Sequence, residues 1–427
     1  MAKTSQDRIL FTKQMKKEYT ILIPQMLPIH FAMISNVFHR HGYNMELLTT
    51  TGKSVINEGL RNVHNDTCYP ALLVIGQMID ALNSGKYDLD KTALMITQTG
   101  GGCRASNYIH LLRKGLKKSG FGHIPVISLN LSGLESNPGF KLTINMLREL
   151  IFSLFYGDLI MHLSQSVKPY EKNIGQTDTL VTKWENILNE QMKIGKGMSS
   201  KKLGQNAEKI IADFDQIEQT GEQKIKVGVV GEIYVKYAPL GNNNLEQLLL
   251  DEGAQCNTPG VLDFIIFKTD NRMEDIKIYG GNPVKYFVVK LFKDYVIKCQ
   301  HVMLKCLSKY PKFDTLKDFE HKKKLVKDYV GYGNKMGEGW LLIAEMLELI
   351  ESGFPNIVCT QPFGCLPNHI IGKGMIKKIR TDHPLSNIVA IDYDPGASEA
   401  NQENRIKLML QNARRNLTLN QNENEKI

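Results

Sequence analysis

The sequence predicts an α/β protein with two doubly wound, Rossmann-like domains and a helical connector between them. Short runs of Val, Ile and Leu alternate with segments of helical spacing, which is typical of βαβ units and a parallel sheet. The alternation occurs twice, and the stretch between its two occurrences contains no strand-like run. A chain of 427 residues is also long for a single core. We therefore expect an N-terminal α/β domain at 1–151, a helical connector at 152–224 and a C-terminal α/β domain at 225–427.

The N-terminal domain is predicted from strands that proline or glycine ends. A β-branched run stops at a proline in YTILIP (19–24), and a helix-like stretch follows from about Pro28. Two further strands are KTALMIT (91–97), which runs into glycines, and IPVISLNLSG (124–133). Two segments have apolar residues at helical spacing and end in Ser-Gly, which predicts a helix in each: YPALLVIGQMIDALNSG (69–85) and CRASNYIHLLRKGLKKSG (103–120).

The C-terminal domain repeats the pattern. It begins with the strand QKIKVGVVG (223–231) and continues with VLDFIIFK (261–268) and a helical stretch to about Val330. Two later strands are expected at NIVC (356–359) and NIVAIDYDPG (387–396). The polar tail at 416–427 is expected to fray.

Composition restricts the class of protein. No run of about 18 apolar residues and no signal peptide is visible, so we expect a cytoplasmic chain that does not enter a membrane. Seven cysteines in such a chain argue against a disulfide framework. The chain has a net charge of +9, and lysines are concentrated in segments such as KDFEHKKKLVKDY (317–329). We interpret these segments as solvated helix faces, with a docking surface as the alternative. No basic strip is interleaved with aromatic residues, so nucleic acid is not an expected partner.

Four cysteines occupy the ends of predicted strands or the starts of predicted helices: Cys68, Cys103, Cys359 and Cys365. A helix N-terminus offers unpaired N–H groups and a partial positive charge, and both stabilise a thiolate. Cys299 and Cys306 lie seven residues apart on one face of a predicted helix, where core packing explains them better. The chain has no C-x-x-C pair, which argues against a zinc ribbon. Scattered thiolates favour an iron–sulfur site, with a thiol enzyme or redox sensor, or structural cysteines around a ligand, as alternatives.

Other polar and glycine residues complete the candidate site. Gly101 and Gly102 before Cys103 would let bare backbone approach a bulky anionic group, and Arg104 would lie beside it. Neither this turn nor GEGW (337–340) has the spacing of a nucleotide-binding loop. We also mark Glu232, Lys236 and His369 as groups that could move protons at a bound substrate.

Six longer strings carry a family resemblance: NDTCYPALLVIGQ, ITQTGGGCRASNY, VGVVGEIYVKYAPLGNNNLE, GEGWLLIAEMLELI, CTQPFGCLPNHIIGKGMIKKIR and IDYDPGASEANQENRIKLML. Together they resemble the C-terminal half of the large acyl-CoA dehydratase activase fusion proteins. That half is similar to the dehydratase component of 2-hydroxyacyl-CoA dehydratases and to the double-cubane cluster proteins. The resemblance covers nearly the whole chain apart from the helical middle and the tail.

The resemblance implies a 4Fe–4S centre held by cysteines of both domains, and it leaves a double cubane open. Cys68, Cys103 and Cys365 match the motif positions best, while Cys359 would be a fourth ligand or a thiol behind the ligands. A separate activator ATPase of the actin-like fold would drive a low-potential electron into this chain.

The chain would then act as a reductase or a 2-hydroxyacyl-CoA dehydratase-like component on an acyl-CoA or another small reducible substrate. The fusion proteins carry the ATPase in the same chain, and no phosphate loop of that fold is seen before Lys91, so ATP is expected to bind the partner. The alternatives are a non-catalytic scaffold or regulatory module that binds the ATPase, and a cysteine-nucleophile enzyme. A homodimer is the expected oligomer.

Overall fold

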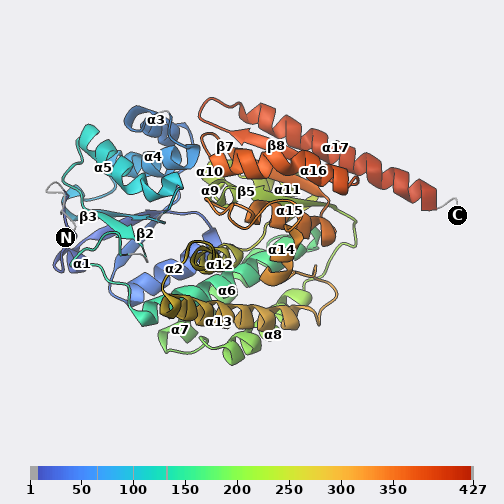
Figure 1. The fold of residues 1–427 in the computed structure, drawn as a ribbon, viewed down its shortest axis with the longest axis horizontal. Coiled ribbons are helices and arrows are strands. Elements are labelled where there is room, and N and C mark those ends of the chain that lie inside the picture. Colours follow the sequence, from blue (N-terminus) through green and yellow to red (C-terminus); the bar gives the residue numbers. More distant parts are fainter. Residues whose placement is uncertain (1–7, 65, 100, 131–132, 425–427) are drawn as a thin grey trace.

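Two four-stranded, all-parallel sheets organise the chain, which confirms the predicted α/β class (Figure 1). The computed structural model describes residues 8–64, 66–99, 101–130 and 133–424. The first sheet has the order β2-β1-β3-β4, with β1 (Thr20–Pro24), β2 (Asn44–Leu48), β3 (Thr92–Thr97) and β4 (Val126–Leu129). The second has the order β6-β5-β7-β8, with β5 (Ile225–Gly231), β6 (Ala254–Asn257), β7 (Asn356–Pro362) and β8 (Asn387–Tyr393). Both sheets therefore use the same strand order, as Rossmann-like doubly wound domains do.

Helices cover both faces of the first sheet. Ile21 and Ile23 of β1 pack in one apolar cluster with Phe38 of α2, while Leu22 between them packs in another with α4. This alternation follows from the two-residue period of a strand. The helices of this part are α1 (Met15–Glu18), α2 (Pro28–Arg40), α3 (Lys53–Asn62), α4 (Tyr69–Asn83) and α5 (Tyr108–Lys118).

The second sheet is covered in the same way. Ile357 and Cys359 of β7 lie in the cluster that includes α15, and Val358 lies in the opposite cluster with Ile406 of α17. Its helices are α9 (Ile233–Tyr237), α10 (Pro239–Asn242), α11 (Leu245–Asp251), α15 (Leu341–Glu351), α16 (Gly374–Asp382) and α17 (Glu399–Asn424). In the tail that was expected to fray from 416, α17 continues as a helix to Asn424, and 425–427 lie outside the described residues.

A third layer is helical. It contains α6 (Ile144–Val167), α7 (Gln176–Lys193) and α8 (Ser200–Asp215) from the middle of the chain. These helices pack against α12 (Val261–Tyr279), α13 (Pro283–Leu307) and α14 (Phe319–Leu325), which the second half contributes. The segment at 261–268 is thus the start of a long helix. By length and composition α6 with its following turn could cross a membrane, but 78% of its most apolar window is buried within the protein, as in a core helix.

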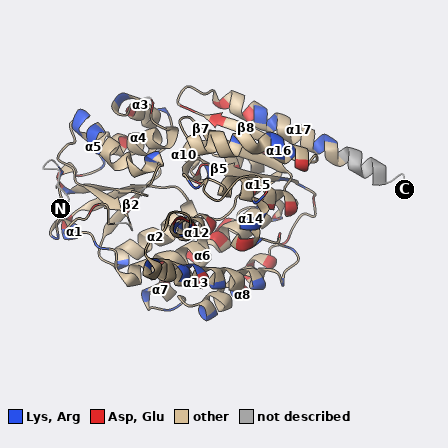
Figure 2. Ribbon diagram, in the orientation of Figure 1, with Lys and Arg blue, Asp and Glu red and all other residues tan. Residues whose placement is uncertain are grey.

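Charged side chains between α12, α13 and α14 are turned inward. Lys322 of α14 is buried and donates to Asp263 of α12 at 2.7 Å, and Lys293 of α13 donates to Asp270 of α12 at 2.6 Å. Figure 2 shows the acidic and basic segments of these helices next to one another. The interpretation of 317–329 as a solvated helix face is therefore wrong for Lys322, because the α12 carboxylates give its ammonium group buried partners.

Candidate functional site

The candidate site lies at the carboxyl ends of both sheets. In doubly wound sheets, ligands bind outside the carboxyl ends of the strands, where the strand order reverses. That reversal falls between β1 and β3 in one sheet and between β5 and β7 in the other. Cys103 follows β3, Glu232 follows β5 and Cys365 follows β7. Predicted site residues from both halves of the chain therefore lie near the two reversal points.

Cys68, Cys103 and Cys365 share one local geometry. Cys68 is the N-cap of α4, and Cys103 is the N-cap of a 3-10 turn (Arg104–Ser106) that leads into α5. Cys365 precedes the helical turn that begins at 366. Each thiol receives a backbone N–H from two or three residues further along, at Ala71, Ala105 and Asn368 respectively. Such donors favour the thiolate, which is the form that binds metal.

Backbone contacts tie the three cysteine turns together. Tyr69 N–H donates to the Phe363 carbonyl at 2.9 Å, which holds the start of α4 against the turn that carries Cys365. Arg104 Nη1 donates to the Asp66 carbonyl at 2.7 Å, which ties the Cys103 turn to the loop before Cys68. Arg104 is therefore a positioning residue for these turns. The two domains meet directly at the cysteines.

Gly364 allows the closest of these approaches. Its φ is +73°, and a Cβ atom at this position would lie 3.0 Å from Cys68 Cα. We expect Gly364→Ala to destabilise the fold by roughly 1–2 kcal/mol for the left-handed backbone, plus the cost of separating the two turns. Gly85→Ala is the matched control, since Gly85 has φ +72° and no atom near its Cβ position.

The measurement is the midpoint of guanidinium unfolding together with the rate at which Cys68 and Cys365 are alkylated. Gly364→Ala should lose more stability than the control and should label faster. Equal losses in the two variants would show that the turns do not press on each other.

Burial dominates the electrostatics of the three thiols. It raises the pKa of Cys68 to about 11, although the Tyr108 hydroxyl, 2.9 Å from its Sγ, lowers that pKa. Burial likewise raises the pKa of Cys103 and of Cys365, and the carboxylates of Glu232 and Glu338 raise both further. The thiols are therefore protonated at neutral pH unless a cation replaces the protons.

Two carboxyl groups lie beside the thiols. Glu232 caps α9 by accepting Val235 N–H at 2.9 Å, and Glu338 accepts Ile233 N–H at 3.0 Å. Burial, followed by the charge of Glu338, raises the pKa of Glu232 to about 8, and burial also raises the pKa of Glu338. Lys268 of α12 donates to the Gly337 carbonyl, and burial lowers the pKa of its ammonium group. Glu232 can thus hold a proton near neutral pH, beside the Glu338 carboxyl.

A pH effect on stability follows from Glu232. Its pKa rises from 4.5 to about 8 on folding, so its stabilising contribution is complete below about pH 4.5 and is lost as the pH rises through 8. Between pH 5 and pH 9 we expect the wild type to lose roughly 2 kcal/mol relative to Glu232→Gln, with allowance for a half-buried group. Urea unfolding at both pH values measures this. The exposed Glu399→Gln is the control, and an identical pH dependence in wild type and Glu232→Gln would contradict the assignment.

Cys359 is fully buried and is linked to Cys365 through polar side chains. The strand β7 runs to Pro362, so Cys359 is inside the strand and not at its end as the sequence suggested. Its Sγ accepts Gln361 Nε2–H at 2.8 Å, and Asn368 Nδ2 donates to Cys365 Sγ at 3.5 Å. Gln361 Nε2 is also 3.4 Å from Asn368 Oδ1, so a chain of polar contacts links Cys359 to Cys365. Burial raises the pKa of Cys359 to about 12.

The glycines before Cys103 have different surroundings. Gly101 has φ +90° with open space at its Cβ position, and its carbonyl accepts Ser106 Oγ–H at 3.1 Å. A Cβ atom on Gly102 would lie 2.4 Å from Met336 Sδ. The space beside Gly102 thus accommodates the exposed Met336 side chain.

The other predicted polar residues are spread around the site. Lys236 is buried and donates to both carboxylate oxygens of Glu345 on α15, at 2.9 and 3.1 Å, so its charge is already paired. His369 is half-buried, one turn after Cys365, and its backbone N–H donates to the Cys365 carbonyl. Cys299 and Cys306 are buried on α13, which confirms core packing, and Cys256 is buried in β6.

Sequence reasoning missed Tyr108, Glu338, Lys268 and Asn368 as neighbours of the thiols. Two of them had a local signal, because Tyr108 is five residues after Cys103 and Asn368 three residues after Cys365. Glu338 belongs to GEGW, whose glycines have φ +55° and +48° and turn this carboxyl inward. Lys268 reaches the site only through the packing of α12.

A cavity of about 480 Å³ lies away from the thiols, between α2, α6, α7 and the segment from α9 to α11. Of the predicted site residues that the structure describes, Lys236 alone lines it. Among the described residues, no three His, Cys, Asp or Glu side chains lie close enough to hold a single metal ion. All seven cysteines are unpaired.

No known family model matches the chain, and no curated protein is significantly similar to it. The function is therefore inferred from the residues of the site.

Proposed function

We propose that the chain is a cytoplasmic iron–sulfur protein whose cluster lies between the two α/β domains, with Cys68, Cys103 and Cys365 as its thiolate ligands. The observation that supports this most is that three helix-start thiols, two from one domain and one from the other, lie on turns that contact each other. A 4Fe–4S cluster extends over several ångströms, so it needs ligands further apart than a single ion does.

The donor set fits such a group. Soft thiolates are the ligands of iron–sulfur clusters, and the N–H donors at Ala71, Ala105 and Asn368 would stabilise the ligand sulfurs. Cys359 is proposed as a thiol behind Cys365, acting through Gln361 and Asn368. An unpaired buried hydroxyl, that of Tyr234 next to Glu232, is a further donor at the site.

The cluster, when bound, would supply one-electron redox chemistry. The residues of this chain would hold and deliver the protons. Glu232 and Glu338 would hold a proton between them and deliver it to a substrate oxygen, since their raised pKa values keep a proton available at neutral pH. Lys236, paired with Glu345, would fix the position of α9 and so of Glu232. His369 would be a second proton donor on the Cys365 side.

An activator ATPase of the actin-like fold is the proposed electron donor, and an acyl-CoA or another small reducible molecule is the proposed substrate class. The chain would then be a reductase or a 2-hydroxyacyl-CoA dehydratase-like component. Anaerobic reconstitution followed by iron and sulfide analysis tests the cluster. A colourless chain that binds no iron would overturn the proposal, and the ligand assignment is tested separately by the variants in the Discussion.

A further inference from the structure

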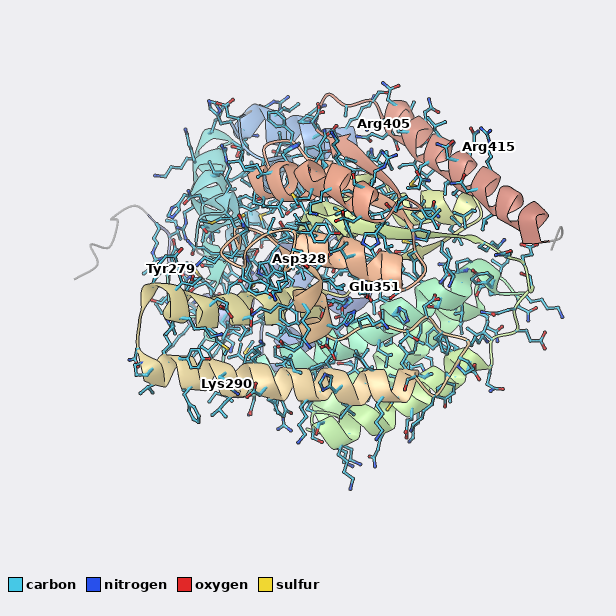
Figure 3. The ribbon with its side chains drawn as sticks, turned by 45° about the vertical axis from the view of Figure 1, so that its right-hand side comes forward. Tyr279, Lys290, Asp328, Glu351, Arg405 and Arg415 are labelled. Carbon is cyan, nitrogen blue, oxygen red and sulfur yellow. The ribbon has the colours of Figure 1, made fainter. Side chains whose placement is uncertain are left out.

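An apolar face is exposed on the first half of α13. The hairpin of α12 and α13 projects from the body, with Tyr279 at its end and Lys290 on its outer helix (Figure 3). Six apolar side chains on α13 are 40–68% exposed, and their spacing of three and four residues puts them on one side of the helix. They are Val284, Phe287, Val288, Leu291, Phe292 and Tyr295. We call them the α13 stripe.

The opposite side of α13 already has its partners. Lys293 pairs with Asp270, and Gln300 donates to Asp263 at 2.9 Å. The helix is thus fixed to the body by its inner face. In its second half, the exposed positions are polar, as at Lys298, His301 and Lys305. An ordinary surface helix looks like that second half, so the stripe requires an explanation of its own.

We infer that the α13 stripe is the contact surface for a second copy of this chain, packed antiparallel across a two-fold axis. The stripe is symmetric about the point between Val289 and Lys290. An antiparallel pair centred there places three apolar couples against each other: Val284 with Tyr295, Phe287 with Phe292, and Val288 with Leu291. A two-fold interface requires this self-complementarity. If one residue of the first copy contacts a second residue of the other copy, the reverse contact must also form.

The area and the charge agree with this occupant. The six side chains together expose roughly 600 Å², which is about three-quarters of the ~800 Å² that each partner buries in a stable interface. Two copies of a chain with net charge +9 repel each other in general. Beside the stripe, however, Lys290 is paired with Asp294 on the same helix, so this flank adds little net charge. The inference does not depend on the iron–sulfur proposal.

The oligomeric state of the full chain tests the inference. Sedimentation equilibrium at micromolar concentration should give a dimer for the wild type. Leu291→Glu should weaken it by at least roughly 100-fold, because a carboxylate would enter the apolar contact close to its copy. Leu291 is 54% exposed in the single chain, so this change should leave the fold of each chain intact, which far-UV circular dichroism checks, and should remove only the dimer's contribution to the unfolding midpoint. Leu385→Glu, at an 86% exposed leucine near the start of β8, is the matched control and should remain dimeric.

The pairing register has its own test. In the double variant Val288→Glu/Leu291→Lys, the new carboxylate of one copy would face the new ammonium of the other, so the dimer should return in part. A monomeric wild type would overturn the inference, and so would a dimer that Leu291→Glu leaves intact. A monomer that binds anionic phospholipid vesicles through Leu291 would instead assign the stripe to a membrane surface, and would overturn it as well.

Discussion

Cys103→Ser is expected to abolish most of the iron and sulfide that the reconstituted wild type binds. Cys103 lies beyond the carboxyl end of β3, as the N-cap of the turn that leads into α5, and its thiol is a soft donor that a serine hydroxyl does not replace. Changing a residue that only supports a ligand typically costs 10–100-fold in metal affinity, so the loss of a ligand should exceed about 10-fold. Iron and sulfide analysis, with the visible absorbance of the cluster, measures the effect. We expect the same loss for Cys68→Ser and Cys365→Ser.

Cys306→Ser is the matched control for these variants. Cys306 is buried on α13, and its thiol lies 3.6 Å from the Gly204 carbonyl, to which a serine hydroxyl can donate. This variant should bind as much iron as the wild type. Cys359→Ser separates a ligand from a supporting thiol, since we expect it to keep the iron and to change only the reduction potential. Full iron binding by Cys103→Ser would show that Cys103 is not a ligand, even if the wild type holds a cluster.

Lys322→Met is expected to cause the largest loss of stability, about 3–5 kcal/mol. The Lys322 ammonium is 4% exposed, lies 2.7 Å from Asp263 and 3.6 Å from Glu348, and both carboxylates are buried. Burial lowers the pKa of Lys322, but the two carboxylates raise it by more than burial lowers it. The net pKa is therefore raised, and the group stays charged. Its removal leaves two buried carboxylates without their cation. The free-energy cost of removing these carboxylates from water is then no longer offset by an ion pair.

Guanidinium unfolding followed by tryptophan fluorescence measures this loss, because Trp340, one of the two tryptophans, packs against Phe319 of α14 with 5.8 Å between the ring centroids. Lys378→Met is the control. Lys378 pairs with Asp382 on the surface of α16, both side chains being more than one-third exposed, and such pairs contribute less than about 1 kcal/mol. If the two variants lost equal stability, the buried network would not be the source of the effect.

The helices and strands show where local sequence was sufficient. The strands β1, β3, β4, β5, β7 and β8 have apolar runs and clear ends, and they were predicted. The strand β6 was not, because its four residues include Gln255 and Asn257 and have no strand signature of their own. Its pairing with β5 defines it. Cys359 was predicted at the end of its strand for the same reason. The strand β7 continues past Cys359 to Pro362 because these residues pair with β8, and the local sequence does not show that pairing.

The sequence by itself determined the α/β class and the placement of Cys68, Cys103 and Cys365 at helix starts. Both depend on residue periodicity and on turn residues within a few positions, which a single chain displays directly. Only the tertiary structure decided which turns meet, that Glu338 lies beside Glu232, that Lys322 is buried, and that the α13 stripe is left exposed. These features depend on contacts between residues up to hundreds of positions apart, and such contacts arise from the packing of whole helices and sheets, which no local pattern encodes.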